Sequence, residues 1–301
     1  MDVFEKLITE NIVLDQDVLW FTDVYSDGLY RYSLESGEVS CVAALEDEKV
    51  RRIHQFSHIV AIENEVYLVP LRASKIFCFD KKTSEVLSID IPTNVISEWD
   101  YYNVNRRFAK GFYYNDSIFL VGMTYPAIVQ IDVLSKKTKV WNAWLQSALK
   151  YCNTEGADIC REAMEFEGKI FAPISFGNAV LEFDMQKCSS RIYEVGDESN
   201  SYSTICYAFI ARICDSFWLS TCDNRKIVKW NKGANVVQEY PLLSFMETND
   251  IDIFKELVYE DGWIYMLPIV TDRVVRIKKE TEELEVLKLE DENILKIHRD
   301  E

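Results

Sequence analysis

A small set of cations stands out in this acidic chain because the cations occur in pairs or recur in register. These residues are Arg52, Arg106, Arg107, Lys110, Arg161 and Lys255. A guanidinium group can hold two oxygens of a carboxylate or phosphate at once, and an ammonium adds a point charge. We therefore expect a site for an anionic group such as a carboxylate, a phosphate or an acidic sugar.

Aromatic residues lie just before the second arginine pair. Trp99, Tyr101 and Tyr102 fall within the segment 98–107, beside amide and guanidinium groups. Flat aromatic faces next to such groups are typical of sites for sugars and peptides. Ordinary packing of a long loop would use the same residues, so both interpretations stay open here.

Acids and one histidine support a different hypothesis, in which the same region is catalytic. Glu162, Glu256 and His58 could act as general acid or base in a lyase or a lactonase-type hydrolase working on a sugar acid or lactone. The simplest alternative is that Lys110, Arg161 and neighbouring cations pair with these acids. Exposed pairs of this kind contribute only about 0 to 1 kcal/mol and need no function.

A repeat positions all these residues. Six apolar strands are centred on Trp20, Tyr67, Phe119, Phe171, Trp218 and Tyr265, and a second apolar strand is centred ten residues after each. The copies are 47 or 52 residues apart. A period near fifty with four short strands, A to D, in each copy indicates an all-β, six-bladed β-propeller with four antiparallel strands per blade.

The repeat resembles the β-propeller superfamily, kelch and YncE-like repeats included, at the level of fold. It lacks the glycine doublet of kelch blades, and its one Trp-Asp pair, Trp99-Asp100, has no companions of the kind found in WD40 repeats. The resemblance implies one domain over residues 1–301 and no particular activity. The expected blades are 9–45, 56–92, 108–142, 160–196, 207–242 and 254–290.

The turns separate two sides of such a fold. Each A–B turn has two residues, such as Glu167-Gly168, and each strand C ends on a polar residue, such as Asp80 or Asp132, that can cap the following C–D turn. We call this the hairpin side. The D–A and B–C connections emerge opposite, on the loop side, where long irregular segments favour binding. The helical spacing of Leu145 and Leu149 predicts a short helix in one of them.

The amino-acid composition disfavours some classes of binding partner. Fifty acidic and thirty-three basic residues give a net charge of −17, which disfavours nucleic acid and anionic membranes. The first residues lack a signal-peptide pattern and no long apolar run follows, so we expect a cytoplasmic protein. Eight cysteines without a C-x-x-C pair indicate free, mostly buried thiols and no metal site. The leading interpretation is a non-enzymatic propeller that binds a protein or a carbohydrate-like ligand and needs no cofactor.

Overall fold

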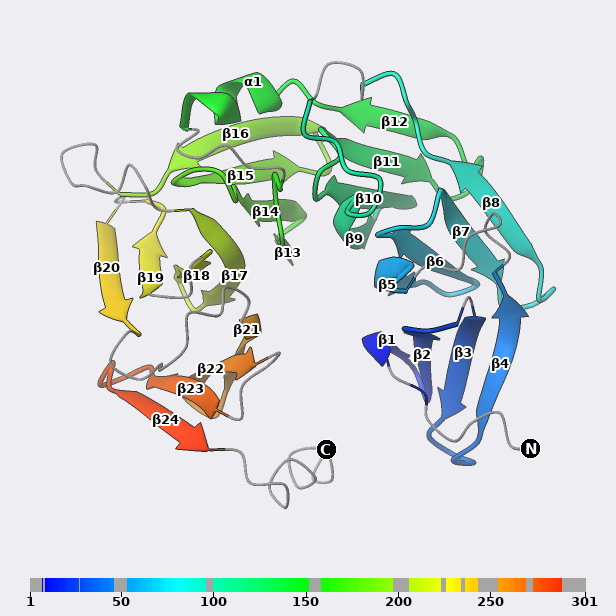
Figure 1. The fold of residues 1–301 in the computed structure, drawn as a ribbon, viewed down its shortest axis with the longest axis horizontal. Coiled ribbons are helices and arrows are strands. Elements are labelled where there is room, and N and C mark those ends of the chain that lie inside the picture. The colour runs from blue at the N-terminus through cyan, green and yellow to red at the C-terminus, as the bar shows by residue number, and fades with distance from the viewer. Residues whose placement is uncertain are drawn as a thin grey trace. The chain divides into compact units, whose positions relative to one another are not determined.

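The structure, a computed structural model, describes residues 7, 9–26, 28–45, 53–95, 100–151, 158–196, 206–222, 226–233, 236–242, 254–268 and 273–288. In this part of the chain, twenty-four strands form six four-stranded sheets, and the strands of each sheet are consecutive in sequence (Figure 1). The predicted fold class, an all-β, six-bladed β-propeller with four antiparallel strands per blade, is confirmed.

The strands follow the repeat that the sequence predicts. Blade 1 contains β1 Thr9–Asp15, β2 Val18–Asp23, β3 Gly28–Ser33 and β4 Val39–Ala44. Blade 2 contains β5 Phe56–Ala61, β6 Glu65–Pro70, β7 Lys75–Asp80 and β8 Val86–Asp90. Blade 3 contains β9 Phe108–Tyr114, β10 Ser117–Gly122, β11 Ile128–Asp132 and β12 Thr138–Trp141.

The later blades repeat this order. Blade 4 contains β13 Met164–Phe166, β14 Lys169–Pro173, β15 Ala179–Asp184 and β16 Ser189–Glu194. Blade 5 contains β17 Tyr207–Ile213, β18 Ser216–Thr221, β19 Lys226–Asn231 and β20 Val236–Pro241. Blade 6 contains β21 Phe254–Glu260, β22 Trp263–Pro268, β23 Arg273–Lys278 and β24 Leu284–Lys288. The predicted helix is α1, Leu145–Ala148, and a 3₁₀ turn follows at Leu149–Tyr151.

Contacts group the chain into two compact units, and the division runs through blade 4. The first unit contains residues 1–147, 156–170 and 183–190, and the second contains residues 148–155, 171–182 and 191–301. We describe each unit by itself, and the single-domain organisation stays a prediction.

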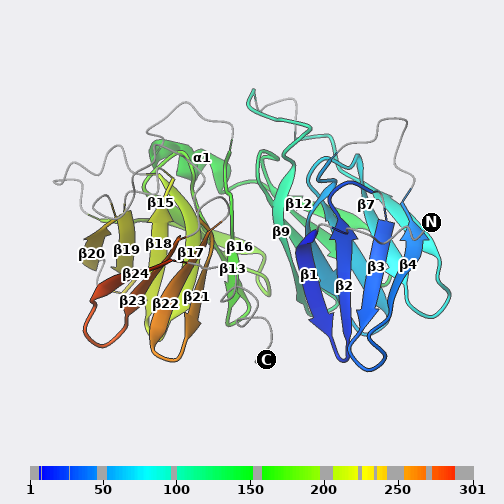
Figure 2. The same cartoon turned by 60° about the horizontal axis from the view of Figure 1, so that its bottom comes forward.

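The core of the first unit consists of apolar side chains between successive blades. Trp20 of blade 1 packs with Phe79 of blade 2, with ring centroids 5.8 Å apart. Tyr67 and Phe119, the repeat's aromatics in blades 2 and 3, are at most 1% exposed. Figure 2 shows the four strands of blade 1 side by side. In the blades of this unit the aromatic at the centre of strand B is therefore buried, which explains its recurrence there.

The second unit repeats this arrangement. Trp218 of blade 5 belongs to a buried cluster with Met266 and Ile277 of blade 6. Trp218 stacks on Tyr240 with ring centroids 5.3 Å apart. Phe171 packs on Phe217 at 4.6 Å. Burial of such large rings supplies the main stabilising free energy of both units.

The predicted turn caps are confirmed. Asp80 Oδ1 accepts hydrogen bonds from the N–H groups of Lys82 at 2.7 Å and Thr83 at 2.9 Å. Asp132 Oδ1 accepts from the Ser135 N–H at 2.7 Å and from its hydroxyl at 2.6 Å. These hydrogen bonds to the ionised form hold the pKa of each carboxyl below its usual value. The acids at this repeat position are thus turn-forming residues.

The A–B turns agree only partly with the type I′ expectation. Both central residues have positive φ in Asn115-Asp116, Glu167-Gly168 and Asp261-Gly262. In the turns at Gln16 and Cys214 only the first residue does, and in Glu63-Asn64 neither does. The φ angles therefore fit type I′ in three of the six turns and do not fit it in the other three.

Lysines from the C–D turns reach back to the preceding blade. Lys81 of blade 2 pairs with Asp15 of blade 1, and its Nζ lies 5.7 Å from the Trp20 ring centroid. Lys136 of blade 3 pairs with Glu65 of blade 2 and lies 5.1 Å from the Tyr67 ring. Each cation thereby covers the aromatic at the centre of the earlier blade.

The cysteines that the structure describes are unbonded, as expected, and Cys78, Cys160 and Cys206 are buried. Cys41 and Cys214 are exposed, so burial is less general than the sequence predicts. Cys214 occupies an A–B turn, where no apolar contact is required.

Candidate functional site

The loop side of the first unit contains a cluster of charged groups around one buried acid, Asp158. Its side chain is 7% exposed, and its Oδ2 atom lies 2.9 Å from Arg106 Nη2 and 3.2 Å from Arg161 Nε. The Arg106 side chain is 43% exposed and that of Arg161 is 22% exposed. Two guanidinium groups therefore share a single carboxylate oxygen, and Arg106 extends from it toward solvent.

A second ion pair lies beside the first. Lys110 Nζ is 2.6 Å from Glu162 Oε1, and both side chains are 22% exposed. The Cys160 thiol lies between the two acids in sequence and donates to the Glu162 carbonyl at 2.9 Å. Burial, with Glu162 nearby, raises the pKa of this thiol well above its usual value, so Cys160 is not a nucleophile at neutral pH. The pairing of Lys110 with Glu162 agrees with the alternative that these cations pair with neighbouring acids and have no catalytic role.

A β-bulge lies near the start of strand A in the first three blades and contains Lys110 in blade 3. The pairing register shifts between Phe56 and His58 in blade 2 and between Phe108 and Lys110 in blade 3. The same shift occurs between Thr9 and Asn11 in blade 1. An extra residue at this point turns the following side chain toward the next blade. Accordingly Asn11 Nδ2 donates to the Phe56 carbonyl at 2.8 Å.

His58 follows the same pattern, and its environment makes it a poor acid or base. Its Nδ1 atom accepts a hydrogen bond from the Gly111 N–H at 3.4 Å. Burial, followed by the charge of Lys110, lowers the pKa of His58 to about 3. An imidazole with this pKa is neutral at physiological pH and has little basicity, which weakens the catalytic interpretation of His58.

Arg107, unlike Arg106, holds its own loop together. Its side chain is buried, and its Nε donates to the Tyr102 hydroxyl at 3.1 Å. Its Nη1 donates to the carbonyl groups of Arg72, at 2.6 Å, and Val104. Because these donors are engaged within the protein, Arg107 fixes the loop conformation and we do not include it among ligand-binding groups.

The B–C loop of blade 3 positions the cluster. The Thr124 hydroxyl lies 2.6 Å from the Arg106 carbonyl oxygen and accepts from the Asn103 N–H at 3.0 Å. The neighbouring Met123 carbonyl accepts from the N–H of Ile159, in the segment that carries Asp158 and Arg161. One short loop thus fixes the backbone on both sides of the Arg106–Asp158 pair, a role that turn composition alone did not reveal.

We expect Thr124→Val to lower the free energy of unfolding by about 1 to 3 kcal/mol, because Thr124 is fully buried and the Asn103 N–H loses its acceptor without a change in side-chain size. Chemical denaturation measures this difference. Thr83→Val is the matched control, since the Thr83 hydroxyl accepts a comparable local bond at 3.3 Å in an exposed turn; it should stay within about 0.5 kcal/mol of wild type. Equal effects of the two substitutions would contradict the assignment.

The remaining predicted site residues are placed only in part. Tyr101 is 44% exposed, and Tyr102 packs edge-on against Tyr125 with centroids 6.2 Å apart. Arg52 and Trp99 lie outside the described residues. The backbone of Lys255 and Glu256 belongs to β21, and their side chains are outside the described part.

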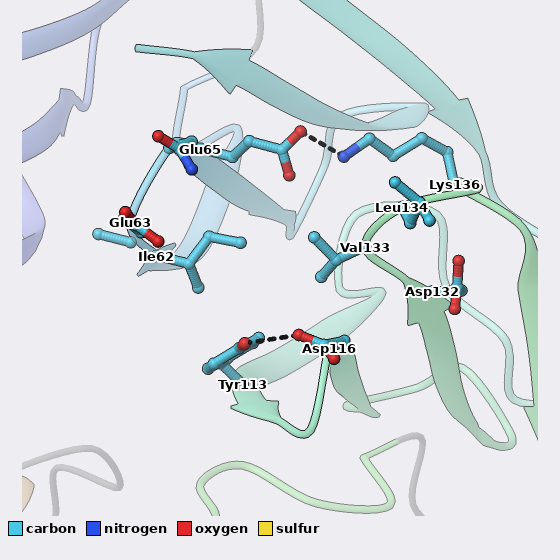
Figure 3. Close-up of a pocket in the computed structure, with 11 residues that line it drawn as sticks. Ile62, Glu63, Glu65, Tyr113, Asp116, Asp132, Val133, Leu134 and Lys136 are labelled. Atoms are coloured by element: carbon cyan, nitrogen blue, oxygen red, sulfur yellow. Dashed lines mark hydrogen bonds and ion pairs between the residues drawn. The ribbon is translucent and has the colours of Figure 1, made fainter. Parts of the chain in front are cut away.

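A pocket of about 720 Å³ opens on the hairpin side, away from the predicted binding region. It is lined by the A–B turn of blade 2 and by the A–B and C–D turns of blade 3, and Figure 3 shows Glu65 paired with Lys136 and Tyr113 bonded to Asp116 around it. The lining residues are Ala61, Ile62, Glu63, Asn64, Glu65, Tyr113, Asp116, Asp132, Val133, Leu134 and Lys136. Sequence reasoning missed this pocket because it treated all hairpin turns as equivalent.

The described residues contain neither a metal-ligand cluster nor a membrane-spanning helix. No group of three or more His, Cys, Asp or Glu side chains there could hold a metal ion. No helix in the described ranges has the length and apolar character needed to cross a membrane.

Comparison with known proteins identifies the fold but no family. No family model matches the chain, and no curated protein matches it. Among solved structures, it is similar to BamB from Moraxella catarrhalis, with a TM-score of 0.60, 12% identity, and coverage of 92% of this chain and 75% of BamB. A chain of the Mitotic Checkpoint Complex gives 0.60 at 10% identity, with coverage of 95% and 84%.

A third neighbour is the extracellular domain of a putative hybrid two component system, BT4673, from B. thetaiotaomicron. The TM-score is 0.65 at 13% identity, and the match covers 96% of this chain but 37% of that one. The chain thus spans little more than a third of this neighbour. At such identities the likeness concerns the fold alone, and by fold the chain belongs with the β-propellers.

Proposed function

We propose that this propeller is a non-enzymatic binding protein whose loop side holds a carboxylate-bearing protein segment at Arg106 and Arg161. The observation that carries the proposal is the shared Asp158 oxygen. It orients both guanidinium groups, while the Arg106 side chain stays 43% exposed. A positioned, exposed guanidinium loses little further freedom on binding and suits a carboxylate fork.

The local charge supports an anionic ligand although the whole chain is acidic. Arg106, Lys110 and Arg161 are three cations that face two carboxylates, those of Asp158 and Glu162. Among these five described side chains, the positive charges outnumber the negative charges by one. Distant acids weaken its attraction only slightly, because salt screens exposed charges beyond roughly 8 to 10 Å.

Binding fits the described groups better than catalysis. Glu162 is paired with Lys110 at 2.6 Å, and His58, with a pKa of about 3, is not in its imidazolium form at neutral pH and so cannot act as a general acid. A protein partner is preferred over a sugar acid because Tyr101, beside the arginines, is 44% exposed, and tyrosine and arginine are the residues enriched at protein interfaces. One structural neighbour was itself solved in an assembly, the Mitotic Checkpoint Complex.

The test is fluorescence anisotropy with a labelled glutamate-rich peptide, a glutamine-rich peptide of equal length, and a glucuronate oligomer. We expect the glutamate peptide to bind best, with an affinity that falls as salt rises. Arg106→Glu should weaken binding by roughly 10- to 100-fold, the range for a charged hydrogen-bond pair. Lys187→Glu is the control, because the Lys187 side chain is 75% exposed in a C–D turn.

Two outcomes would refute the proposal. One is equal binding of the glutamate and glutamine peptides, which would show that charge plays no part. The other is an unchanged affinity in Arg106→Glu. Preference for the glucuronate oligomer would instead support the carbohydrate alternative at the same arginines.

A further inference from the structure

The pocket on the hairpin side has the size of a ligand site. Its volume of about 720 Å³ falls within the roughly 300 to 1,000 Å³ typical of ligand pockets. Its walls come from two blades of the first unit, the turn Ile62–Glu65 and the turn residues 132–136. The pocket opens on the hairpin side, whereas the arginine cluster lies on the loop side, and its charge balance is acidic, so a ligand bound here would be independent of the proposed function.

Its apolar lining is not required by the repeat. Leu134 is 93% exposed at the second position of a C–D turn. In the other five blades this position is Glu35, Lys82, Gln186, Gly233 and Glu280, none of them apolar. A residue that the turn does not need and that stands in water is a candidate contact for a partner. Inside, the side chains of Ile62 and Val133 point toward one another (Figure 3).

The charged lining is acidic in balance. Glu63, Glu65, Asp116 and Asp132 supply four carboxylates, whereas Lys136 supplies one ammonium. That ammonium is already bound to Glu65 and to the Tyr67 hydroxyl, the latter at 2.7 Å. Asp132 is ionised at neutral pH because its hydrogen bonds lower its pKa.

Asp116, another acid of the lining, is held in place by its neighbours. Asp116 Oδ1 accepts from the Tyr113 hydroxyl at 3.2 Å, at the end of the pocket away from the Glu65–Lys136 pair (Figure 3). Asp116 also has positive φ in a two-residue turn, so its backbone is fixed. A cation placed between Asp116 and Asp132 would be neutralised without displacing Lys136.

We propose that this pocket binds a short peptide segment of a partner protein in which a large apolar residue adjoins a lysine or arginine. The apolar side chain lies between Ile62 and Val133 and contacts Leu134, and the cation faces Asp116 and Asp132. A peptide is chosen over a free amine because the apolar wall extends to the exposed Leu134, beyond the enclosed part of the pocket.

The test is isothermal titration of the full chain with three acetylated, amidated hexapeptides that share a Gly/Ser frame. They contain Leu-Arg, Leu-Glu or Ser-Arg at the centre. We expect saturable binding of the Leu-Arg peptide and at least about ten-fold weaker binding of the other two. Leu134→Ser and Asp116→Asn should each weaken Leu-Arg binding by about five-fold or more, since each removes one contact of the proposed pair.

The chain offers matched controls. Asp215→Asn changes the equivalent A–B turn position of blade 5, where the side chain is 99% exposed. Leu34→Ser removes a 49% exposed leucine from the C–D turn of blade 1. Both should bind the Leu-Arg peptide like wild type, and so should Arg106→Glu, which separates this pocket from the arginine cluster. Leu134→Ser should keep the wild-type melting temperature because its side chain is already in water.

Several results would overturn the inference. These are a Leu-Glu peptide that binds as tightly as Leu-Arg, no saturable binding of Leu-Arg up to millimolar concentration, and unchanged binding in Leu134→Ser. Sedimentation velocity adds one more: if wild type self-associates and Leu134→Ser is monomeric, the occupant is a second copy of this chain and the peptide assignment is wrong.

Discussion

Gly122→Ala is expected to lower the free energy of unfolding by about 3 kcal/mol or more. A Cβ atom on Gly122 would lie 1.8 Å from the Tyr125 carbonyl oxygen and 2.8 Å from that of Ala127. Both obstacles are backbone atoms, so a rotamer change cannot relieve the clash. The B–C loop would have to move as a unit.

A shift of this loop would also change the position of Arg106 in the arginine cluster. Gly122 N–H donates to the Ala127 carbonyl at 3.1 Å, and Thr124 N–H donates to the Arg106 carbonyl at 2.9 Å. We therefore expect Gly122→Ala to weaken acidic-peptide binding as well as stability. Thermal and urea unfolding measure the first effect, and anisotropy measures the second.

The control for this substitution is Gly233→Ala, for which the nearest heavy atom is Asn231 Oδ1 at 3.5 Å. It should change stability by no more than about 0.5 kcal/mol. If Gly122→Ala unfolded at the wild-type midpoint, the close approach of the two backbone segments at this loop would be refuted.

The second large effect is a loss of stability in mild acid caused by His58. Its pKa falls from 6.5 in the unfolded chain to about 3 in the folded protein, through burial and the charge of Lys110. Between these values the unfolded state binds one more proton, so stability rises with pH in this window and is lost as the pH falls below about 6.5. By pH 5 the loss from this group is about 2 kcal/mol.

His58→Asn isolates this contribution, because an amide oxygen can replace Nδ1 as the acceptor for the Gly111 N–H and does not titrate. Urea unfolding of both proteins at pH 8, 7, 6 and 5 should give curves that converge as the pH falls. Carboxylates such as Asp80 and Asp132, whose lowered pKa values stabilise the fold above about pH 4, act equally in both proteins. Parallel curves would show that His58 is accessible to protons in the folded state.

The fold could be predicted because the sequence repeat shows the number, order and spacing of the strands. The strand B aromatics stand at one offset in every copy, and five of them are buried, whereas Tyr265 of blade 6 is half-buried. The polar residue at the end of strand C caps the following turn, as Asp80 and Asp132 do. The equivalent positions of His58, Lys110 and Glu162 at the start of strand A could be counted from the aromatics for the same reason.

The site could be predicted only as a region. Arg106 and Arg107 are identical in type, yet Arg106 is exposed and Arg107 is buried. The difference arises because Arg107 donates to the carbonyl of Arg72, a residue distant in sequence. Asp158, the acid that orients the arginines, has no pattern in sequence. Leu134 did carry a signal, an apolar residue where five other turns are polar or glycine, but only the structure places it beside Ile62.

The lysines of the C–D turns contact the preceding blade, and this has a consequence for the order in which the blades are completed during synthesis. Lys81 completes blade 1 and Lys136 completes blade 2, so in each case the covering cation belongs to the blade translated later. On a ribosome, each sheet would gain its final electrostatic contact only when its successor had emerged. Maturation of the first three blades would then proceed vectorially, from the amino terminus onward, and a nascent chain that stopped after Asp80 would leave Trp20 uncovered.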